Sequence, residues 1–282
     1  MKTYLVPVDF SDAAKNAAHF AAQLSHQTDT SDIILMNAFY ISPYETLLPN
    51  PDMLMLREQE IEEDAAKRIK KLNKLKKKLE TEVREGVNVR IRLNRSHLLR
   101  AVVDTVIEEN VDLVFLGSKG NSSAGVPGIG SHVINVSKAS PAPIIVVPPG
   151  YQYSLIDKAV IACDFKQVTE NMPMEILHKL LGNQQINLMV LNIDNEGKHA
   201  TADAEQKAQE TALHGMLKQY RPQYHYVASP DVIEGILNFA GGHNAQLVIA
   251  LPHKYSFFQS LLHSSISQQL ASNSEIPVLL LK

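Results

Sequence analysis

The chain has 282 residues, of which 45% are hydrophobic and 20% charged, and its formal net charge at pH 7 is −3. This composition is typical of a soluble protein with one large domain or two ordinary ones, and it gives no reason to expect a nucleic acid or a membrane as partner. The single cysteine, Cys163, excludes an intrachain disulfide, and the first residues lack a signal segment, so we expect a cytoplasmic protein.

The first half of the chain alternates short apolar runs with helical patterns. Continuous apolar runs are typical of buried parallel strands, whereas apolar residues at intervals of three and four indicate amphipathic helices. Turn and N-cap residues occupy 9–12, and three prolines make 42–51 irregular. The expected strands are 4–8, 33–39, 87–93, 111–116 and 143–148, and the expected helices are 13–24, 52–85, 96–109 (with Ser96 as cap) and one from Val133.

The helix expected over 52–85 begins with acidic residues and continues with a basic run. The early acidic residues suit the helix dipole. A basic outer face can bind an anionic partner but is more often a solvated helix face. The residues placed on this face are Lys67, Arg68, Lys70, Lys71, Lys74, Lys76, Lys77 and Lys78.

A glycine-rich stretch, GSKGNSSAGVPGIGS over 117–131, follows the expected strand 111–116 and precedes a helix. Glycines let the backbone approach a ligand closely, and a helix start offers free N–H donors and a positive dipole end. The order strand, glycine loop and helix therefore indicates a phosphate site. Its spacing matches neither the P-loop nor the Rossmann fingerprint. A loop without a ligand remains an alternative on glycine content alone.

The pattern of the first half returns in the second. Residues 159–165 echo 5–10, and 244–281 align with 110–147 at a constant offset of 134 without a gap. Such self-similarity indicates an internal duplication, and strand–helix alternation builds a parallel sheet covered on both faces. We therefore expect two tandem α/β domains, 1–149 and 150–282, with a linker at their junction.

Ligands of such sheets bind beyond the carboxyl ends of the strands, where the strand order reverses. Asp9, Ala38 and Gly117 each follow or end an expected strand. The sequence therefore predicts that these three residues converge on one cleft, although they lie far apart along the chain.

The first half resembles the universal stress protein family over essentially its whole length. The resemblance rests on VPVDFS at 6–11, ILMNA at 34–38, the strand 143–148 and the stretch 117–131. That stretch matches the G-x2-G-x9-G-S/T signature of the ATP-binding branch. The whole chain looks like a tandem member. The resemblance implies two Rossmann-like domains of the adenine nucleotide alpha-hydrolase-like type, each with a five-stranded parallel sheet.

The resemblance also implies that the first domain binds ATP, with or without Mg²⁺. Pro7, Val8 and Asp9 would border the adenosine, and the backbone of Ala38 would meet the adenine. Asp9 would bind the ribose hydroxyls or help to hold Mg²⁺, with a helix N-cap as the alternative role. Ribose and phosphates would be held by Gly117, Ser118, Gly120, Gly130, Ser131 and the N–H of His132.

The sequence departs from the family pattern at two places. Within the spacer, Asn121 stands where many relatives carry a basic residue, which weakens phosphate charge compensation. In the second half the three motif glycines are replaced by Leu251, Lys254 and Ser264. Since these side chains would fill space that a phosphate needs, we expect no ATP in the second domain.

The leading hypothesis is therefore a stress-response or signalling protein whose conformation or partner choice follows nucleotide state. The alternatives are a scaffold that binds no nucleotide and a slow ATPase, for which no general base or arginine finger is evident. We also expect Ile144–Val147 to pair with Val278–Leu281, which would join the domains as an internal pseudo-dimer and protect both edges. Further dimerisation of the chain to a homodimer is left open.

Overall fold

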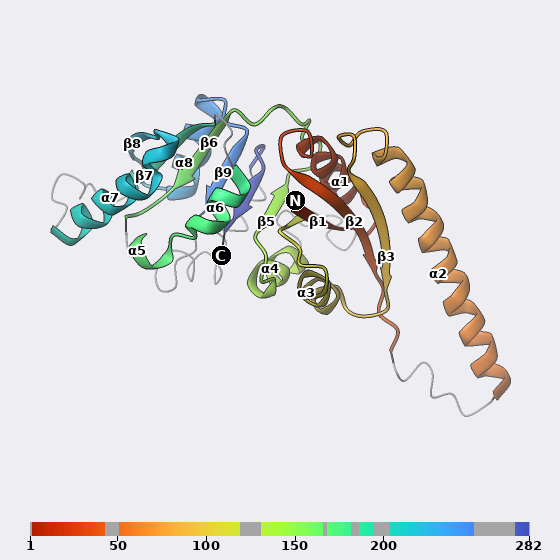
Figure 1. Ribbon diagram of the computed structural model, residues 1–282. Coiled ribbons are helices and arrows are strands. Elements are labelled where there is room, and N and C mark those ends of the chain that lie inside the picture. Colours follow the sequence, from red (N-terminus) through yellow and green to blue (C-terminus); the bar gives the residue numbers. More distant parts are fainter. Residues whose placement is uncertain are drawn as a thin grey trace.

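The computed structural model describes residues 2–42, 51–118, 131–165, 168–181, 186–194, 204–250 and 274–281. Within these ranges strands and helices alternate in both halves (Figure 1). The first half contains β1 (Lys2–Pro7), α1 (Asp12–Leu24), β2 (Thr30–Ala38), α2 (Pro51–Leu79), β3 (Asn88–Asn94), α3 (Leu98–Glu108), β4 (Leu113–Gly117), α4 (Ser131–Ala139) and β5 (Ile144–Val147). The second contains β6 (Lys158–Ala162), α5 (Val168–Asn171), α6 (Met174–Leu181), β7 (Asn187–Asp194), α7 (Ala204–Leu217), β8 (Gln223–Ala228), α8 (Val232–Gly242), β9 (Leu247–Ala250) and β10 (Val278–Leu280).

These strands form one ten-stranded sheet in the order β3-β2-β1-β4-β5-β10-β9-β6-β7-β8. Pairing is parallel within each half, and the expected fold of two five-stranded parallel units is confirmed. The halves meet through the antiparallel pair β5–β10, in which Ile145 lies opposite Leu279. The predicted pairing of the two last strands is thus confirmed, and it removes two apolar edges from solvent.

The two faces of the sheet are covered differently. On the face of α1, α2, α6 and α7, one hydrophobic core runs across both halves. On the other face, α3 and α4 cover a core of the first half, and α8 covers a separate core of the second half. The junction of the halves is therefore part of a continuous core on one side only. In the described ranges, no helix has the length and apolar character needed to cross a bilayer.

The internal repeat extends to individual hydrogen bonds. Ser140 Oγ donates to the carbonyl oxygen of Ala142 at 2.9 Å, and Ser274 Oγ donates in the same way to Ile276 at 2.5 Å. Left-handed backbone also recurs at matching positions. The residues concerned are Phe10 and Phe165, with φ of 67° and 56°, and Asn110 and Asn244, with φ of 48° and 52°.

The segment that joins the halves is bound to the first half. Gln27 Nε2 donates to the carbonyl oxygen of Ile156 at 3.2 Å, and Gln27 Oε1 accepts from the Ile156 N–H at 2.8 Å and from the Tyr153 hydroxyl. The rings of Tyr151 and Tyr153 also lie 5.8 and 5.3 Å from the ring of Phe20. The expected linker is therefore a docked connection.

Two predicted helix boundaries need correction. The helix expected to reach residue 85 ends at Leu79, and a turn follows that leads to Gly86, with φ of 83°. Ser96 is not the cap of α3, because His97 holds that position without a side-chain hydrogen bond. Ser96 Oγ instead donates to Asn94 Oδ1 at 2.7 Å. Periodicity marks the apolar stripe of a helix well but leaves its ends open.

Candidate functional site

The candidate site lies where the strand order reverses, between β1 and β4. The order β2-β1-β4 places the ends of these strands side by side, at Ala38, Pro7 and Gly117. The structure thus brings Asp9, which follows β1, to the same edge of the sheet as Ala38 and Gly117. This edge is the usual ligand position in open parallel sheets.

A buried asparagine links the ends of β1 and β2. Val8 N–H donates to the carbonyl oxygen of Met36 at 2.7 Å, and Asn37 Nδ2 donates to the carbonyl oxygen of Val8 at 2.6 Å. Asn37 Oδ1 accepts from Arg68 Nη1 at 3.0 Å, and the Arg68 guanidinium lies 4.8 Å from the centre of the Phe39 ring. These contacts fix the backbone that enters the candidate site.

Arg68 corrects one prediction and adds a residue to the site. The sequence places Arg68 on the outer face of α2, but the half-buried side chain turns toward β2. Sequence reasoning also missed Asn37. Its signal was a polar residue within an apolar run that recurs in the second half as Asn192, where Nδ2 donates to the carbonyl oxygen of Cys163 at 2.9 Å. A buried asparagine in a strand needs such partners.

Asp9 supports the cap of α1 but is not the cap itself. Ser11 Oγ accepts from the Ala14 N–H at 3.2 Å, which makes Ser11 the N-cap. Asp9 Oδ1 in turn accepts from the N–H and the hydroxyl of Ser11, at 2.9 and 2.5 Å. Asp9 is exposed. The site therefore carries an oriented, solvent-accessible carboxylate at the end of β1.

Gly117 is needed for packing whether or not a ligand binds. A Cβ at this position would lie 2.6 Å from the carbonyl carbon of Ala13 and 2.7 Å from its oxygen. The glycine thus allows the start of α1 to rest on the end of β4. The neighbouring Ser118 is fully buried, and its N–H donates to the carbonyl oxygen of Val147 at 3.0 Å. Its Oγ has no hydrogen-bond partner among the described residues.

The other predicted site residues are placed only in part. Gly120 and Gly130 lie outside the described residues. Ser131 and His132 form the first positions of α4, and their side chains are not described. Over the described ranges, there is no group of three or more histidine, cysteine or acidic residues that could hold a metal ion.

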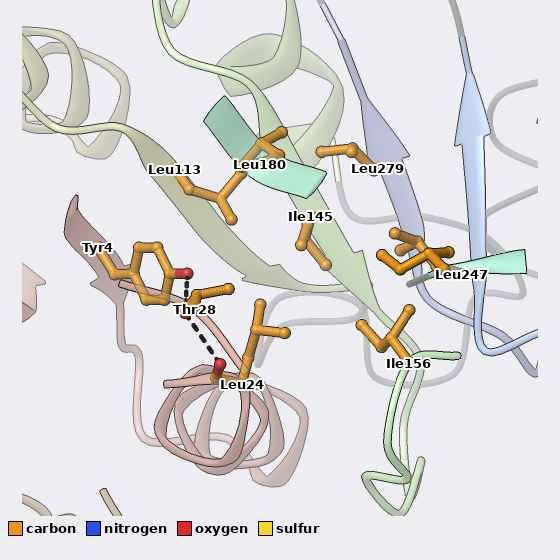
Figure 2. A pocket seen from close by; sticks show the side chains of 10 residues that line it. Tyr4, Leu24, Thr28, Leu113, Ile145, Ile156, Leu180, Leu247 and Leu279 are labelled. Carbon is orange, nitrogen blue, oxygen red and sulfur yellow. Dashed lines mark hydrogen bonds between the residues drawn. The ribbon is translucent and has the colours of Figure 1, made fainter. Parts of the chain in front are cut away.

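A small cavity lies elsewhere, between the two halves (Figure 2). Its volume is about 30 Å³, and its walls include Leu113 with Leu247 and Ile145 with Leu279, two pairs related by the internal repeat. The Tyr4 hydroxyl donates to Thr28 Oγ1 at 2.7 Å. The cavity is too small and too apolar for a nucleotide, and it reflects imperfect packing at the junction.

Comparison with known proteins identifies the family. The model of the universal stress protein family matches residues 1–148 and 164–282. No curated protein matches the chain. A universal stress protein from Archaeoglobus fulgidus DSM 4304 has 17% identity and a TM-score of 0.71, over 99% of this chain and 98% of that one. A functionally unknown protein from Pseudomonas aeruginosa PAO1 has 12% identity and a TM-score of 0.60, over 100% and 92%. The structural likenesses concern the fold, whereas the family match covers nearly the whole sequence. The chain therefore belongs to the universal stress protein family and carries two copies of its domain in tandem.

Proposed function

We propose that the first half binds ATP at the carboxyl ends of β1, β2 and β4. In this proposal the protein changes conformation or partner with nucleotide state, as part of a stress response. The observation that carries the proposal is the convergence of Asp9, Ala38 and Gly117 at the reversal of strand order. The glycine-rich sequence that follows Gly117 and leads into α4 supports it, because a helix start favours phosphate.

The residues present fit an adenine nucleotide. The exposed carboxylate of Asp9 suits the ribose hydroxyls, and the backbone at Ala38 suits the adenine edge. The free N–H groups at the start of α4, with the hydroxyl of Ser131, suit the phosphates. Ser118 Oγ, which has no hydrogen-bond partner among the described residues, is a further polar atom where β4 ends. Mg²⁺ would enter with the nucleotide and would neutralise phosphate charge, and Asp9 would help to hold it in the alternative in which its carboxylate does not bind the ribose.

The charged groups near the site already form hydrogen bonds within the protein, which favours nucleotide binding over efficient hydrolysis. Asp9 holds the backbone and hydroxyl of Ser11, and Arg68 holds Asn37. A carboxylate that fixes a helix cap is poorly placed to activate water, and an arginine bound to a strand end is poorly placed to stabilise a transferring phosphoryl group. We therefore propose a nucleotide-binding protein in which any hydrolysis of ATP is slow.

Isothermal titration of the full chain with Mg-ATP tests the proposal. We expect one site per chain. Asp9→Asn should lower the affinity by roughly ten- to a hundredfold, because one charged hydrogen bond is worth roughly 1.5–3 kcal/mol. The matched variant Asp164→Asn, at the equivalent position of the second half, should leave the affinity unchanged. Gly120→Lys with Gly130→Leu should abolish binding. Absence of binding at millimolar ATP would overturn the proposal in favour of a scaffold that binds no nucleotide.

A further inference from the structure

The helix α2 is much longer than the strand it accompanies. It has 29 residues, or roughly 44 Å at 1.5 Å per residue, whereas the 7 residues of β3 span roughly 23 Å. Among the side chains of α2 that the structure describes, Ile61 is the first that is buried, and Met55 and Leu56 are 69% and 63% exposed. Figure 1 shows α2 as the outermost element at this end of the sheet, with its amino-terminal end beyond β3.

The side of α2 that faces away from the core is exposed and mostly polar. The buried residues Ile61, Ala65, Leu72 and Leu79 define the inner side. On the opposite side, exposed residues recur at alternating intervals of three and four, as along one face of any helix, and most of them are polar, so a contact here would depend on charge and not on an apolar seam. This outward face consists of Leu56, Gln59, Glu63, Ala66, Lys70, Asn73 and Lys77, flanked by Glu60, Lys67 and Lys74.

The outward face is acidic before Ala66 and basic after it. Glu60 and Glu63 lie on one side, and Lys70 and Lys74 lie on the other. Across the described residues, neither of these two lysines forms an ion pair, whereas Glu60 pairs with Arg57 of the same helix at 2.8 Å. The outward face therefore carries negative charge at its amino-terminal end and positive charge at its carboxy-terminal end, where Lys70 and Lys74 form no ion pair with the described residues.

We propose that the outward face of α2 pairs with the same face of a second copy of this chain, antiparallel, about a two-fold axis near Ala66. This arrangement places Glu63 opposite Lys70 of the second copy and Glu60 opposite its Lys74. A parallel arrangement would place like charges together. A surface that complements itself in this way meets the requirement of a two-fold interface.

Two further observations favour a second copy over other partners. A nucleic acid or an anionic membrane would be attracted by the lysines but repelled by Glu60 and Glu63 on the same face. The central residue, Ala66, is small, which lets two helix backbones approach closely. In addition, β5 and β10 are already paired within the chain, so self-association through those edges is blocked.

Charge reversal with sedimentation velocity on the full chain tests this proposal. Exposed ion pairs are weak and screened by salt, so we expect a concentration-dependent dimer at low salt that dissociates at high salt. Lys70→Glu with Lys74→Glu makes the face acidic throughout, and Glu60→Lys with Glu63→Lys makes it basic. Each variant alone should be monomeric, and an equimolar mixture of the two should form a heterodimer.

The control variant has the same change in net charge as Lys70→Glu with Lys74→Glu, but the substitutions lie on the second half and not on α2. Lys207→Glu with Lys218→Glu, at two exposed residues of the second half, should dimerise as the original chain does. Circular dichroism establishes that each variant is folded. The proposal is overturned if the original chain stays monomeric at low salt over the whole concentration range. Unchanged dimerisation of either α2 variant, or a mixture that stays monomeric, would also overturn it.

Discussion

The two halves share a backbone scaffold but differ at the ends of their strands. Asn37 and Asn192 bind the ends of β1 and β6 in the same way, at 2.6 and 2.9 Å. At the other end of these strands, Asp112 Oδ2 and Gln246 Oε1 accept from the N–H groups of Thr3 and Lys158, at 2.7 and 2.9 Å. The same backbone groups are thus bound in both halves, although the accepting side chain is a carboxylate in Asp112 and an amide in Gln246.

What differs is the surrounding of the candidate site. The first half has the 13-residue helix α1 resting on Gly117, whereas the second half has α5 and α6, of 4 and 8 residues. The first half also has α2, which supplies Arg68, whereas α7 contains no arginine. At the strand-end site, Asn37 and Asp9 thus recur as Asn192 and Asp164, whereas Gly117 and Arg68 are particular to the first half.

The largest expected effect comes from Gly117→Ala. The added Cβ would meet the backbone of Ala13, which cannot move without shifting α1. We expect the free energy of unfolding to fall by about 3 kcal/mol, the upper range for overpacking. Urea denaturation followed by circular dichroism measures it.

The control for this substitution is in the second half. Gly215→Ala adds a Cβ that meets no atom within 4 Å, in the last turn of α7. It should raise the free energy of unfolding by about 0.5–1 kcal/mol through helix propensity. If Gly117→Ala is equally harmless, α1 does not rest on β4 as the structure has it.

The next prediction tests whether Arg68 makes Asn37 contribute more than Asn192 to the free energy of unfolding. Asn37→Ala and Asn192→Ala each leave a buried carbonyl without its donor, at a cost of about 1–3 kcal/mol. Asn37→Ala should cost more, because it also removes the acceptor of Arg68. With Arg68→Met as background, the costs of the two asparagine substitutions should become equal in urea denaturation. An unchanged difference would show that Arg68 does not contribute.

Much of the fold follows from the sequence, for a physical reason. Buried parallel strands are continuous apolar runs, and a duplicated chain repeats them at a fixed offset, so strand positions and the β5–β10 pairing can be inferred. The orientation of Arg68 and the docking of the linker on Gln27 depend on how helices and connections pack. Such contacts join residues far apart in sequence, and no local pattern encodes them.

At the candidate site the limits are similar. The convergence of Asp9, Ala38 and Gly117 could be predicted, because parallel strands end at one edge. The role of Ser11 as cap, with Asp9 behind it, could not, because both residue types cap helices equally well. The packing reason for Gly117 was also hidden, since a phosphate loop and a close helix call for the same residue.

The third prediction uses Cys163, which stands in the second half where the first has Val8. Burial, with a smaller contribution from Asp164, raises the pKa of the Cys163 thiol from 9.0 to about 12. Above pH 9 the thiol ionises in the unfolded chain but not in the folded one. The free energy of unfolding should therefore fall with rising pH by about 1.4 kcal/mol per pH unit from this group.

Cys163→Val copies the first half and should remove this part of the pH dependence. The two proteins should have similar stability at pH 7, where the thiol is neutral in both states. Urea denaturation of both at a series of pH values above 9 gives the difference. A constant difference over that range would mean that Cys163 is accessible enough to ionise in the folded protein.

The smallest effect concerns the left-handed residues that end α3 and α8. Asn110 and Asn244 have φ of 48° and 52°, and the next residues donate N–H to Val106 and Ala240 at 3.0 and 2.9 Å. Glycine at either position removes the strain of the left-handed conformation, but it also makes the unfolded chain more flexible. Because these effects oppose each other, Asn110→Gly and Asn244→Gly should each change the free energy of unfolding by less than about 1 kcal/mol. Because the two turns have the same geometry, the two changes should be equal in sign and size. Urea denaturation measures both changes in the free energy of unfolding. If they had opposite signs, the two turns would differ in backbone strain although their asparagine and hydrogen bonds are the same.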